Sequence, residues 1–337
     1  MTKRVVITGV AGFLGSHLAD RFLQEGWEVV GIDNLIGGYL DNVPSGVEFH
    51  NLDLTEATLE LDEAFVGAEL VIHAACTAYE GLSVFSPSLV VDNTVMATVN
   101  TLGSSIRAGV SKVVYMSSMA RYGDHGDQQF SEEMETKPQD PYGIAKVASE
   151  GLVKNLCDTH GLDWIILVPH NIIGPRQKYD DPYRNVASIM INRMLQENQP
   201  IIYGDGSQRR CFSFITDVVE PLYVACNSSL AHGEVINIGP DEETVTINEL
   251  AERLSRIIEF DLKPQYMPGR PNEVPIAECS SNKARKFLDY RTQVKLEEGL
   301  VEMVDWIRIR GPKPFDYHLP VEIINERTPE TWTKKLI

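Results

Sequence analysis

Three side chains of the sequence, a tyrosine, a lysine and a serine, could together transfer a proton. Tyr142 and Lys146 are four residues apart in PYGIAKVASEGL, so a helix would place both on one face. Ser118 precedes them in VVYMSSMARYGD and offers a hydroxyl group to the same site. A tyrosine and a lysine at this spacing also occur on ordinary half-buried helix faces. The segments around them must therefore show whether the pair has a catalytic role.

The lysine would make the tyrosine a base. A phenol has a pKa of about 10, and a nearby cation favours its ionised form. An ammonium group at ~4 Å, in an effective dielectric of about 20, contributes roughly 4 kcal/mol, or about three pKa units. We therefore expect Lys146 to lower the pKa of Tyr142, so that a phenolate is available as general base near neutral pH.

The start of the chain has a pattern that can bind a dinucleotide. RVVIT is an apolar run typical of a parallel strand buried on both faces. Gly9, Gly12 and Gly15 follow it at the spacing G-x-x-G-x-x-G. The next stretch, up to Gly26, predicts an amphipathic helix, and WEVVGID predicts a second strand with Asp33 at its tip.

Each residue of this pattern has an expected role. Gly9 would permit a tight turn, Gly12 a close approach of the backbone to a pyrophosphate, and Gly15 close packing of helix on strand. Asp33 would accept hydrogen bonds from an adenosine ribose and repel a 2′-phosphate, which favours NAD over NADP. Glycines could serve turns in another α/β protein, but strand, glycines, helix, strand and acid in register weigh against that alternative.

Together these segments resemble the extended short-chain dehydrogenase/reductase superfamily, and within it the NAD-dependent nucleotide-sugar epimerases and dehydratases. The resemblance covers residues 3 to 310 and rests on ordered segments, among them ITGVAGFLGSHL, IDNL, NLDL, VIHAAC, PYGIAK, VPHNIIGPRQ, IIYGDGSQRRCFSFITDV, VINIGP and MPGRPNEVP. It implies a Rossmann-like α/β fold with a doubly wound parallel sheet, NAD as cofactor and no metal. It also implies a catalytic set made of Ser118, Tyr142 and Lys146.

The resemblance assigns the binding residues as well. Expected cofactor contacts are Gly9, Gly12, Phe13, Leu14, Gly15, Asp33, Asn34, Asp53, Leu54, Ala74, Ala75, Asn93, Tyr142 and Lys146. Expected substrate contacts are Ser118, Asn171, Arg210, Arg270, Glu273 and Ala277. Two guanidinium groups suit a diphosphate because each presents a planar fork of donors. A surface salt bridge is the alternative for any arginine, and we expect it for Arg176, Arg184 and Arg209.

The residues beside Ser118 separate the reactions of the family that the chain resembles. Its dehydratases carry an Asp-Glu pair there, its decarboxylases a Glu at the position of Ala120, and its GDP-sugar epimerase-reductases a Cys. This chain has Met119 and Ala120, and SSMARYG contains no Cys. The remaining set suits a 4-epimerase of a UDP-hexose or a UDP-N-acetylhexosamine. A nucleotide-sugar dehydrogenase or dehydratase and a catalytically silent NAD-binding sensor stay as alternatives.

One further expectation concerns the size of the sugar pocket. In the 4-epimerases that the chain resembles, a position four residues after the acid of an R-x-x-[DE] segment limits the space around the sugar's 2-substituent. Counting from Glu273 gives Ala277, which leaves room for an N-acetyl group. A register slip of one residue would select Ile276 or Glu278 instead. We expect UDP-N-acetylglucosamine to be accepted alongside UDP-glucose.

Composition limits the partners. The net charge is −18 and no Lys/Arg cluster interrupts it, which weighs against nucleic acid and anionic membranes. The five cysteines are scattered without a C-x-x-C pair, so we expect neither a disulfide framework nor a zinc site, and a reducing cytoplasm fits. No apolar stretch approaches the ~18 residues of a membrane span, and the N-terminal segment lacks the apolar region of a signal peptide.

The order of strand-like and helical segments predicts the domain organisation. Their alternation to residue 170 indicates a parallel sheet with helices on both faces. We expect an NAD-binding domain over 1–170, an interleaved nucleotide-sugar lobe over 171–310 and a C-terminal extension over 311–337. The late strand-like run EVINIG would return to the first sheet.

The resemblance also implies a homodimer. The helix that carries Tyr142 and a neighbouring helix near residues 93 to 107 would pack against their copies. Small or apolar side chains would permit this close approach: Ala145, Ala148, Gly151 and Val153. A face buried within one chain would have the same pattern.

Overall fold

The centre of the molecule is a parallel sheet of seven strands, seen in a computed structural model that describes residues 3–337. The strand order is β11-β6-β5-β4-β1-β2-β3. The strands are β1 (Arg4–Thr8), β2 (Glu28–Asp33), β3 (Val47–Asn51), β4 (Leu70–His73), β5 (Lys112–Met116), β6 (Asp163–Pro169) and β11 (Val235–Ile238). The predicted doubly wound parallel sheet is confirmed.

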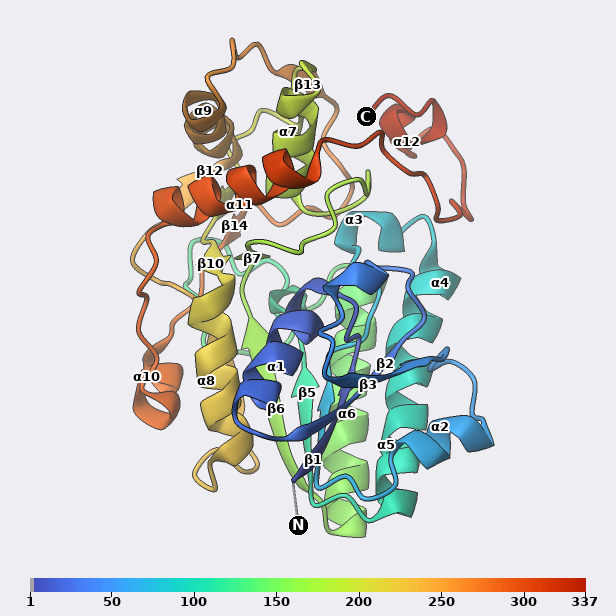
Figure 1. The fold of residues 1–337 in the computed structure, drawn as a ribbon. Helices are drawn as coiled ribbons and strands as arrows, with labels where there is room; N and C mark the ends of the chain where they lie inside the picture. Colours follow the sequence, from blue (N-terminus) through green and yellow to red (C-terminus); the bar gives the residue numbers. More distant parts are fainter. Residues whose placement is uncertain (1–2) are drawn as a thin grey trace.

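Helices cover both faces of this sheet (Figure 1). Val5 and Ile7 of β1 pack in one hydrophobic cluster with α1 (Phe13–Gln24) and α8 (Ile215–Asn227). Val6, between them, points to the opposite cluster. The helices of that second face are α2 (Leu59–Ala64), α5 (Ala97–Ala108) and α6 (Pro141–His160). Because successive strand residues alternate between two buried faces, each strand reads as a continuous apolar run.

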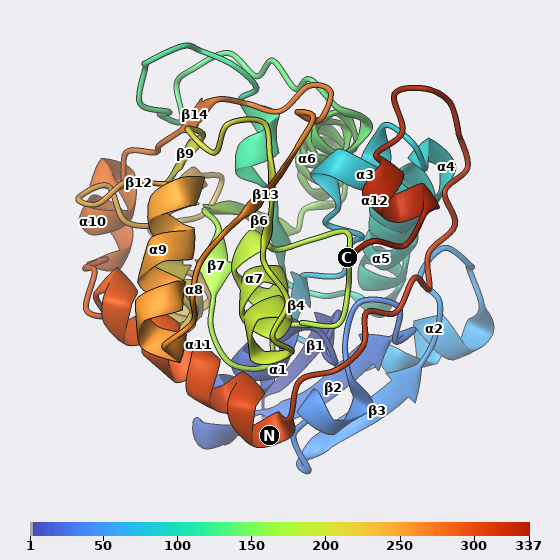
Figure 2. The ribbon, with the colours of Figure 1, turned by 90° about the horizontal axis from the view of Figure 1, so that it is seen from above.

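A smaller lobe lies beyond the carboxyl ends of the strands (Figures 1 and 2). Its helices are α7 (Val186–Leu195), α9 (Ile247–Ile258) and α11 (Leu296–Arg310). Helix α10 (Asn282–Leu288) instead lies beside α8 and β11 of the main sheet (Figure 1). Its short strands are β7 (Ile172–Ile173), β8 (Ile201–Tyr203), β9 (Arg209–Arg210), β10 (Ser213–Phe214), β12 (Val245–Thr246), β13 (Gln265–Met267) and β14 (Ile276–Ala277). The chain leaves this lobe to place α8 and β11 on the main sheet, so the late strand returns as predicted.

A single long helical stretch borders α6 on the second face. It consists of α4 (Pro87–Val91), a π-helical turn η2 (Asp92–Met96) and α5, with helical backbone angles at both junctions. A π-helical turn inside an α-helix often marks a functional site. Short 3₁₀ turns occupy Leu40–Asn42 and Met119–Arg121, and α3 (Glu80–Ser83) precedes α4.

Two residues assigned to a dimer contact lie inside the chain. Ala145 and Val153 of α6 are 2% and 0% exposed, so the expectation that they meet a second copy is wrong. Val153 packs in the hydrophobic cluster of the second sheet face, whereas Ala148 and Gly151 are exposed. Among residues 3–337, no helix combines the length and the apolar character that crossing a bilayer requires.

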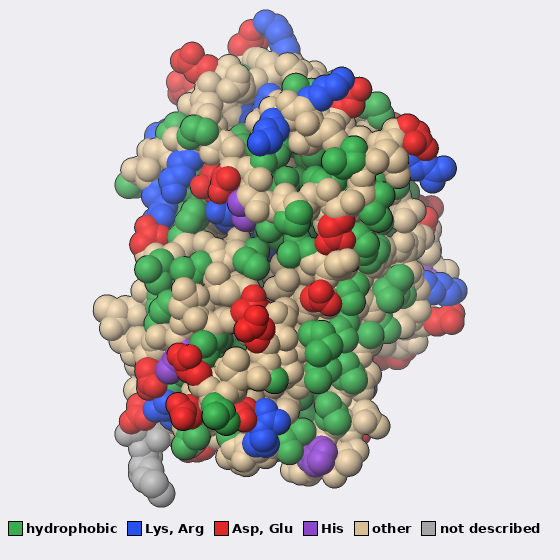
Figure 3. All heavy atoms as spheres, turned by 90° about the vertical axis from the view of Figure 1, so that its right-hand side faces the viewer, with side chains coloured by type: hydrophobic (Ala, Val, Ile, Leu, Met, Phe, Trp, Pro, Cys, Tyr) green, Lys and Arg blue, Asp and Glu red, His purple; other side chains and the backbone are tan. Residues whose placement is uncertain are grey.

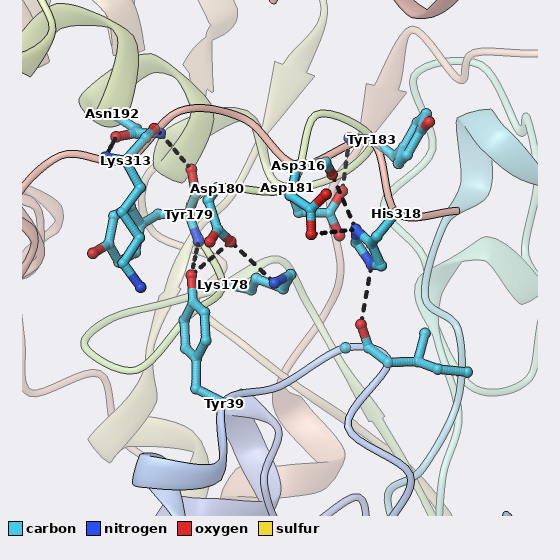
Figure 4. Close-up of polar contacts among 12 residues, drawn as sticks. Tyr39, Lys178, Tyr179, Asp180, Asp181, Tyr183, Asn192, Lys313, Asp316 and His318 are labelled. Atoms are coloured by element: carbon cyan, nitrogen blue, oxygen red, sulfur yellow. Dashed lines mark hydrogen bonds and ion pairs between the residues drawn. The ribbon is translucent and has the colours of Figure 1, made fainter. Parts of the chain in front are cut away.

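The C-terminal extension first runs along the smaller lobe (Figure 4). The backbone N–H of Lys313 donates to the side-chain oxygen of Asn192 (3.0 Å), and that of Asp316 donates to the carbonyl of Asp180 (2.8 Å). These two contacts place the extension beside α7 and the segment that precedes it.

The extension then crosses to the first lobe and ends with α12 (Glu330–Thr333). The Nε2 atom of His318 lies 3.1 Å from the carbonyl oxygen of Ile36, and the N–H of Ile323 donates to the carbonyl of Phe85 (2.8 Å). Trp332 of α12 is buried against Phe85 and Tyr183. The aromatic residues of the extension therefore join both lobes.

Candidate active site

The glycine loop between β1 and α1 forms one end of a cavity at the carboxyl edge of the sheet. Gly9 has a positive φ of +73°, and a Cβ atom there would come 2.9 Å from the backbone of Ala75. A Cβ atom on Gly15 would come 2.1 Å from the carbonyl oxygen of Gly9. Gly12 caps α1 without a side-chain hydrogen bond, which leaves the helix N-terminus free for an anion. The loop thus fits the pyrophosphate of a dinucleotide.

Asp33 stands at the tip of β2, on the wall of this cavity. Its carboxylate accepts hydrogen bonds from the backbone N–H groups of Ala11 (3.0 Å) and Leu35 (2.7 Å). Burial raises the pKa of Asp33, and these backbone hydrogen bonds act in the opposite direction. The side chain is only 9% exposed, so the carboxyl group is fixed where a ribose would reach it.

The other expected cofactor residues line the cavity with one exception. Those that do are Phe13, Leu14, Asn34, Leu54, Ala74, Ala75 and Asn93. Asp53 lies just outside the lining, where it accepts a hydrogen bond from the side chain of Asn34 (3.2 Å). Burial raises the pKa of Asp53, but hydrogen bonds from Thr55 and Asn34 outweigh this and lower it. Asp53 can therefore orient Asn34 without lining the cavity itself.

The start of α6 brings the predicted proton-transfer residues together. Asp140 caps the helix by accepting a hydrogen bond from the N–H of Gly143 (2.9 Å). A Cβ atom on Gly143 would come 2.6 Å from the carbonyl oxygen of Ala120, so the first turn of α6 packs directly on the turn after β5. Three predicted residues consequently line one part of the cavity: Ser118, Tyr142 and Lys146.

Lys146 is held beside Tyr142 without touching its hydroxyl group. Its Nζ atom donates to the carbonyl of Met116 (2.7 Å) and lies 5.8 Å from the centre of the Tyr142 ring. The side chain is 1% exposed. Burial lowers the pKa of Lys146, but the neighbouring groups of Cys76, Tyr115 and Tyr142 outweigh it and raise the pKa. Lys146 is therefore a buried cation.

The expected effect of Lys146 on Tyr142 is not large enough within the protein alone. Burial raises the pKa of Tyr142 above its ordinary value, and Cys76 adds to the rise, while Lys146 and Ser118 act to lower it. The phenol is 5% exposed, so the loss of hydration disfavours the phenolate more than one cation favours it. The prediction of a phenolate near neutral pH from Lys146 alone is wrong.

The opposite part of the cavity carries the predicted substrate residues. Arg270 donates to Glu273 (2.9 Å), and the guanidinium of Arg210 lies 3.9 Å from the same carboxylate. The Arg270 guanidinium also stacks 4.9 Å from the ring centre of Tyr203. Asn171 lines the cavity nearby. Burial lowers the pKa of Arg210, whereas Glu273 outweighs burial at Arg270 and raises its pKa.

Ala277 is not brought to the cavity. It lies in β14, whose backbone pairs with Arg210 of β9, and its side chain packs against the hydrophobic cluster of the second sheet face. It is absent from the residues that line the cavity, and so are Ile276 and Glu278. The position counted from Glu273 therefore does not contact the sugar space.

Arg184 was expected to form a surface salt bridge, and that expectation is wrong. Its guanidinium lines the cavity, donates to the carbonyl of Gly37 (3.2 Å) and lies 5.0 Å from the ring centre of Tyr79. No periodicity or spacing singled it out. Its position depends on how the smaller lobe packs over the sheet.

The two other arginines behave as expected. Arg176 pairs with Asp20 (2.6 Å), and Arg209 pairs with Glu278 (2.8 Å). Neither is among the residues that line the cavity.

Two more cavity residues were missed by sequence reasoning. Glu80 lines the cavity at the start of α3, and Trp332 reaches it from the C-terminal extension. The only signal for Glu80 was its place four residues after the segment VIHAAC. Trp332 lies beyond the segments of the resemblance; the aromatic residues of the extension suggested packing, but nothing in the sequence pointed to the cavity.

Comparison with known proteins identifies the family. A family model described as the NAD dependent epimerase/dehydratase family matches residues 5–239. The chain belongs to this family. NAD is accordingly the cofactor, and the glycine loop and Asp33 have the shape and chemistry to hold it.

The family members most similar to this chain include epimerases of different UDP-sugars. The chain is 32% identical over 313 residues to the UDP-glucose 4-epimerase of Mycolicibacterium smegmatis, covering 90% of this chain and 98% of that one. A UDP-glucose 4-epimerase of Thermotoga maritima, solved with UDP-glucose, superposes with a TM-score of 0.86 at 30% identity, covering 91% and 99%. A UDP-glucuronic acid 4-epimerase of Bacillus cereus, solved with UDP-glucuronic acid and NAD, gives 0.85 at 27%, covering 91% and 100%.

Proposed function

We propose that this protein is an NAD-dependent UDP-sugar 4-epimerase. The observation that carries the proposal is one continuous cavity with the glycine loop at one end, the diphosphate-type arginines at the other and the tyrosine, lysine and serine between them. A nucleotide sugar and a dinucleotide can meet in such a space only at the tyrosine. The similarity to UDP-sugar 4-epimerases over nearly the whole chain supports the same conclusion.

The chain's own residues provide the proton transfer. Tyr142, as phenolate, takes the proton of the sugar's 4-hydroxyl group and becomes a neutral phenol. Ser118 orients that hydroxyl, and Lys146 stabilises the phenolate that exists before the transfer. When bound beside the glycine loop and Asp33, NAD would supply the hydride acceptor and donor for the sugar's C4 and a positive charge in the oxidised form. Burial raises the pKa of Tyr142, so a positive charge on bound NAD⁺ would add to that of Lys146 in favouring the phenolate.

The surroundings of Ser118 favour epimerisation over elimination. Met119 and Ala120 follow Ser118, and Ala120 packs against Tyr142 on the cavity wall. Neither side chain can move a proton, so the keto sugar has no acid–base pair beside Ser118 that would remove water from it. Reduction back to the hydroxyl is then the remaining outcome.

The experiment is an assay of the purified protein with UDP-glucose and UDP-galactose, each as the single substrate. We expect each sugar to be converted into the other, without lasting near-ultraviolet absorbance of NADH. Accumulating NADH would mean a dehydrogenase. An absence of turnover with every UDP-sugar, although NAD and UDP-sugars bind, would mean a sensor.

The division into lobes is part of the proposal. We assign NAD binding to 1–170, nucleotide-sugar binding to 171–310 and closure of the cavity to 311–337. The positions of Asp33, Arg270 and Trp332 along one cavity support this division. All five cysteines are free thiols, which suits a reducing compartment such as the cytoplasm.

We also propose a homodimer formed through α4, α5 and α6. Large hydrophobic side chains are exposed here, with Val91 at 37%, Met96 at 43% and Ile144 at 54%. Figure 3 shows hydrophobic side chains gathered in a band on the face at the right-hand side of Figure 1. A dimer mass in solution that falls to the monomer mass in Ile144→Glu would support the interface, and a wild-type monomer would contradict it.

A further inference from the structure

Glu80 occupies a fixed position in the cavity at the first residue of α3. The preceding residue, Tyr79, is buried and donates a hydrogen bond to Asp181 (2.6 Å), and the carbonyl of Glu80 accepts one from Ser83 (2.7 Å). The Glu80 side chain is accessible to solvent and belongs to the residues that line the cavity. The carboxyl group is therefore part of the binding surface.

The neighbours of Glu80 place it along the sugar. Arg210 and Arg270 are close enough to influence its charge, and Glu80 in turn influences Tyr142. A Cβ atom on Gly81 would come 3.1 Å from the guanidinium of Arg270, so α3 directly faces the diphosphate end. The sugar of a UDP-sugar must span the space between these arginines and the phenol. Glu80 borders that space.

Glu80 is also the acid of this region that has no partner. Glu273 accepts a hydrogen bond from Arg270, and Asp140 accepts one from the N–H of Gly143. The Glu80 carboxyl has no hydrogen bond or ion pair within residues 3–337. Burial first and Asp140 second raise its pKa to about 7, against the opposing effect of the two arginines. A carboxyl group that lines the cavity and has no protein partner is free to bind a ligand there.

We propose that Glu80 selects the sugar, by accepting hydrogen bonds from the hydroxyl groups of a neutral hexose and repelling the carboxylate of a hexuronate. This inference rests on the proposed UDP-sugar 4-epimerase function. Family members differ in this choice, since one acts on UDP-glucose and another on UDP-glucuronic acid. Two carboxylates at close range in one cavity disfavour each other, and such repulsion discriminates between a charged and a neutral sugar.

A cation near Tyr142 would have the opposite effect, because it would attract the carboxylate of a hexuronate. Arg184 lies near Tyr142 in the same cavity, but it already donates to the Gly37 carbonyl and stacks on Tyr79. Glu80 has no such engagement. The free carboxylate therefore sets the charge preference of the sugar space.

Glu80→Gln is the decisive variant, because it keeps the size of the side chain and removes the charge. The specificity ratio, kcat/KM for UDP-glucose divided by that for UDP-glucuronic acid, is measured together with the affinity of each UDP-sugar for the NAD-loaded protein. We expect wild type to prefer UDP-glucose and Glu80→Gln to lower the ratio by about tenfold or more, mainly through KM for UDP-glucuronic acid. Glu302→Gln, on the exposed face of α11, should leave the ratio unchanged.

The pH dependence of the ratio gives a second measurement. Glu80 ionises as the pH rises through about 7, so wild-type preference for UDP-glucose should increase over that range. The titratable and charged groups that face Glu80 are Asp140, Tyr142, Arg210, Arg270 and Glu273. They are present in both proteins, so any pH dependence that they cause would remain in Glu80→Gln. Glu80→Gln should remove the dependence that Glu80 itself causes.

The outcomes separate this inference from the proposed function. Failure of wild type to epimerise any UDP-sugar would remove the proposed function. The difference in affinity between the two UDP-sugars would still report the effect of Glu80 on binding. An unchanged ratio and unchanged affinities in Glu80→Gln would overturn the inference. A wild-type preference for UDP-glucuronic acid would overturn it too and would give Arg184 control of the sugar space.

Discussion

Tyr142 is the base of the proposed reaction, and its surroundings oppose its ionisation in the protein alone. Its phenol is almost fully buried, and Lys146 is anchored on a backbone carbonyl instead of on the phenol. The lysine therefore acts as a fixed charge at a distance. Such a charge stabilises the phenolate in either direction of the proton transfer.

Tyr142→Phe should abolish this chemistry while leaving binding intact. We expect turnover to fall by roughly 10²- to 10⁴-fold, the usual contribution of a general base. Affinities for NAD and for the UDP-sugar should stay close to those of wild type, because only one hydroxyl group is lost. Tyr266→Phe, at an exposed tyrosine of β13, is the matched control. Near-normal turnover in Tyr142→Phe would contradict the assignment of the base.

Asp33 should determine the choice of cofactor. Its carboxylate is held at the cavity wall by two backbone N–H groups, so it cannot move away from a 2′-phosphate. We expect calorimetry to show NAD binding roughly tenfold or more tighter than NADP. Asp33→Asn should narrow the difference, and Asp305→Asn on the exposed face of α11 should preserve it. Equal affinities in wild type would remove this role.

At the scale of elements, the C-terminal extension is fastened to the first lobe at the start of α4. The carboxylate of Glu322 accepts hydrogen bonds from the backbone N–H groups of Ser88 (3.0 Å) and Leu89 (2.9 Å). Burial raises the pKa of Glu322, but these hydrogen bonds outweigh it and lower the pKa. A residue more than two hundred positions away in sequence thus caps the helix.

Glu322→Ala should weaken this attachment. Loss of a helix cap lowers the free energy of unfolding by about 1 kcal/mol. The change is measured by urea unfolding, and proteolysis of the extension should become faster as well. Glu326→Ala changes an exposed acid of the same extension and serves as the control. Identical behaviour of the two variants would mean that the cap does not hold the extension.

At the scale of the whole molecule, two buried histidines make stability depend on pH. His73 and His170 are 2% and 0% exposed, and burial lowers the pKa of each from 6.5 to about 3. His73 bridges β1 and α5 through Thr8 (2.8 Å) and Thr98 (3.1 Å). Both imidazoles are therefore neutral in the folded protein, while the unfolded chain can protonate them.

The free energy of unfolding should consequently fall as the pH falls below about 6.5, because the unfolded state then binds more protons than the folded state. The slope for each histidine is at most about 1.4 kcal/mol per pH unit. His170→Leu should make the acid dependence of urea unfolding less steep. His160→Leu, at the exposed end of α6, should keep the wild-type slope. An equal slope in all three proteins would contradict this account.

The sequence by itself determined the features that depend on local pattern. The apolar runs predicted the sheet, the glycine spacing and Asp33 predicted the cofactor loop, and the Tyr142–Lys146 spacing predicted the proposed catalytic helix. Each of these patterns lies within one or two adjacent elements. The pattern of α6 also predicted a helix, but it could not tell which of its small residues face inward. Ala145 turned out to be buried within the chain.

The tertiary structure alone decided how those groups are charged and what surrounds them. Burial raises the pKa of Tyr142 and outweighs the lowering effect of Lys146. This burial arises from segments that are far apart in sequence. Glu80 and Arg184 reach the cavity, and Ala277 does not, because the smaller lobe and the extension fold over the sheet in one particular way. Desolvation and long-range contacts leave no mark on local spacing, so only the folded chain reveals them.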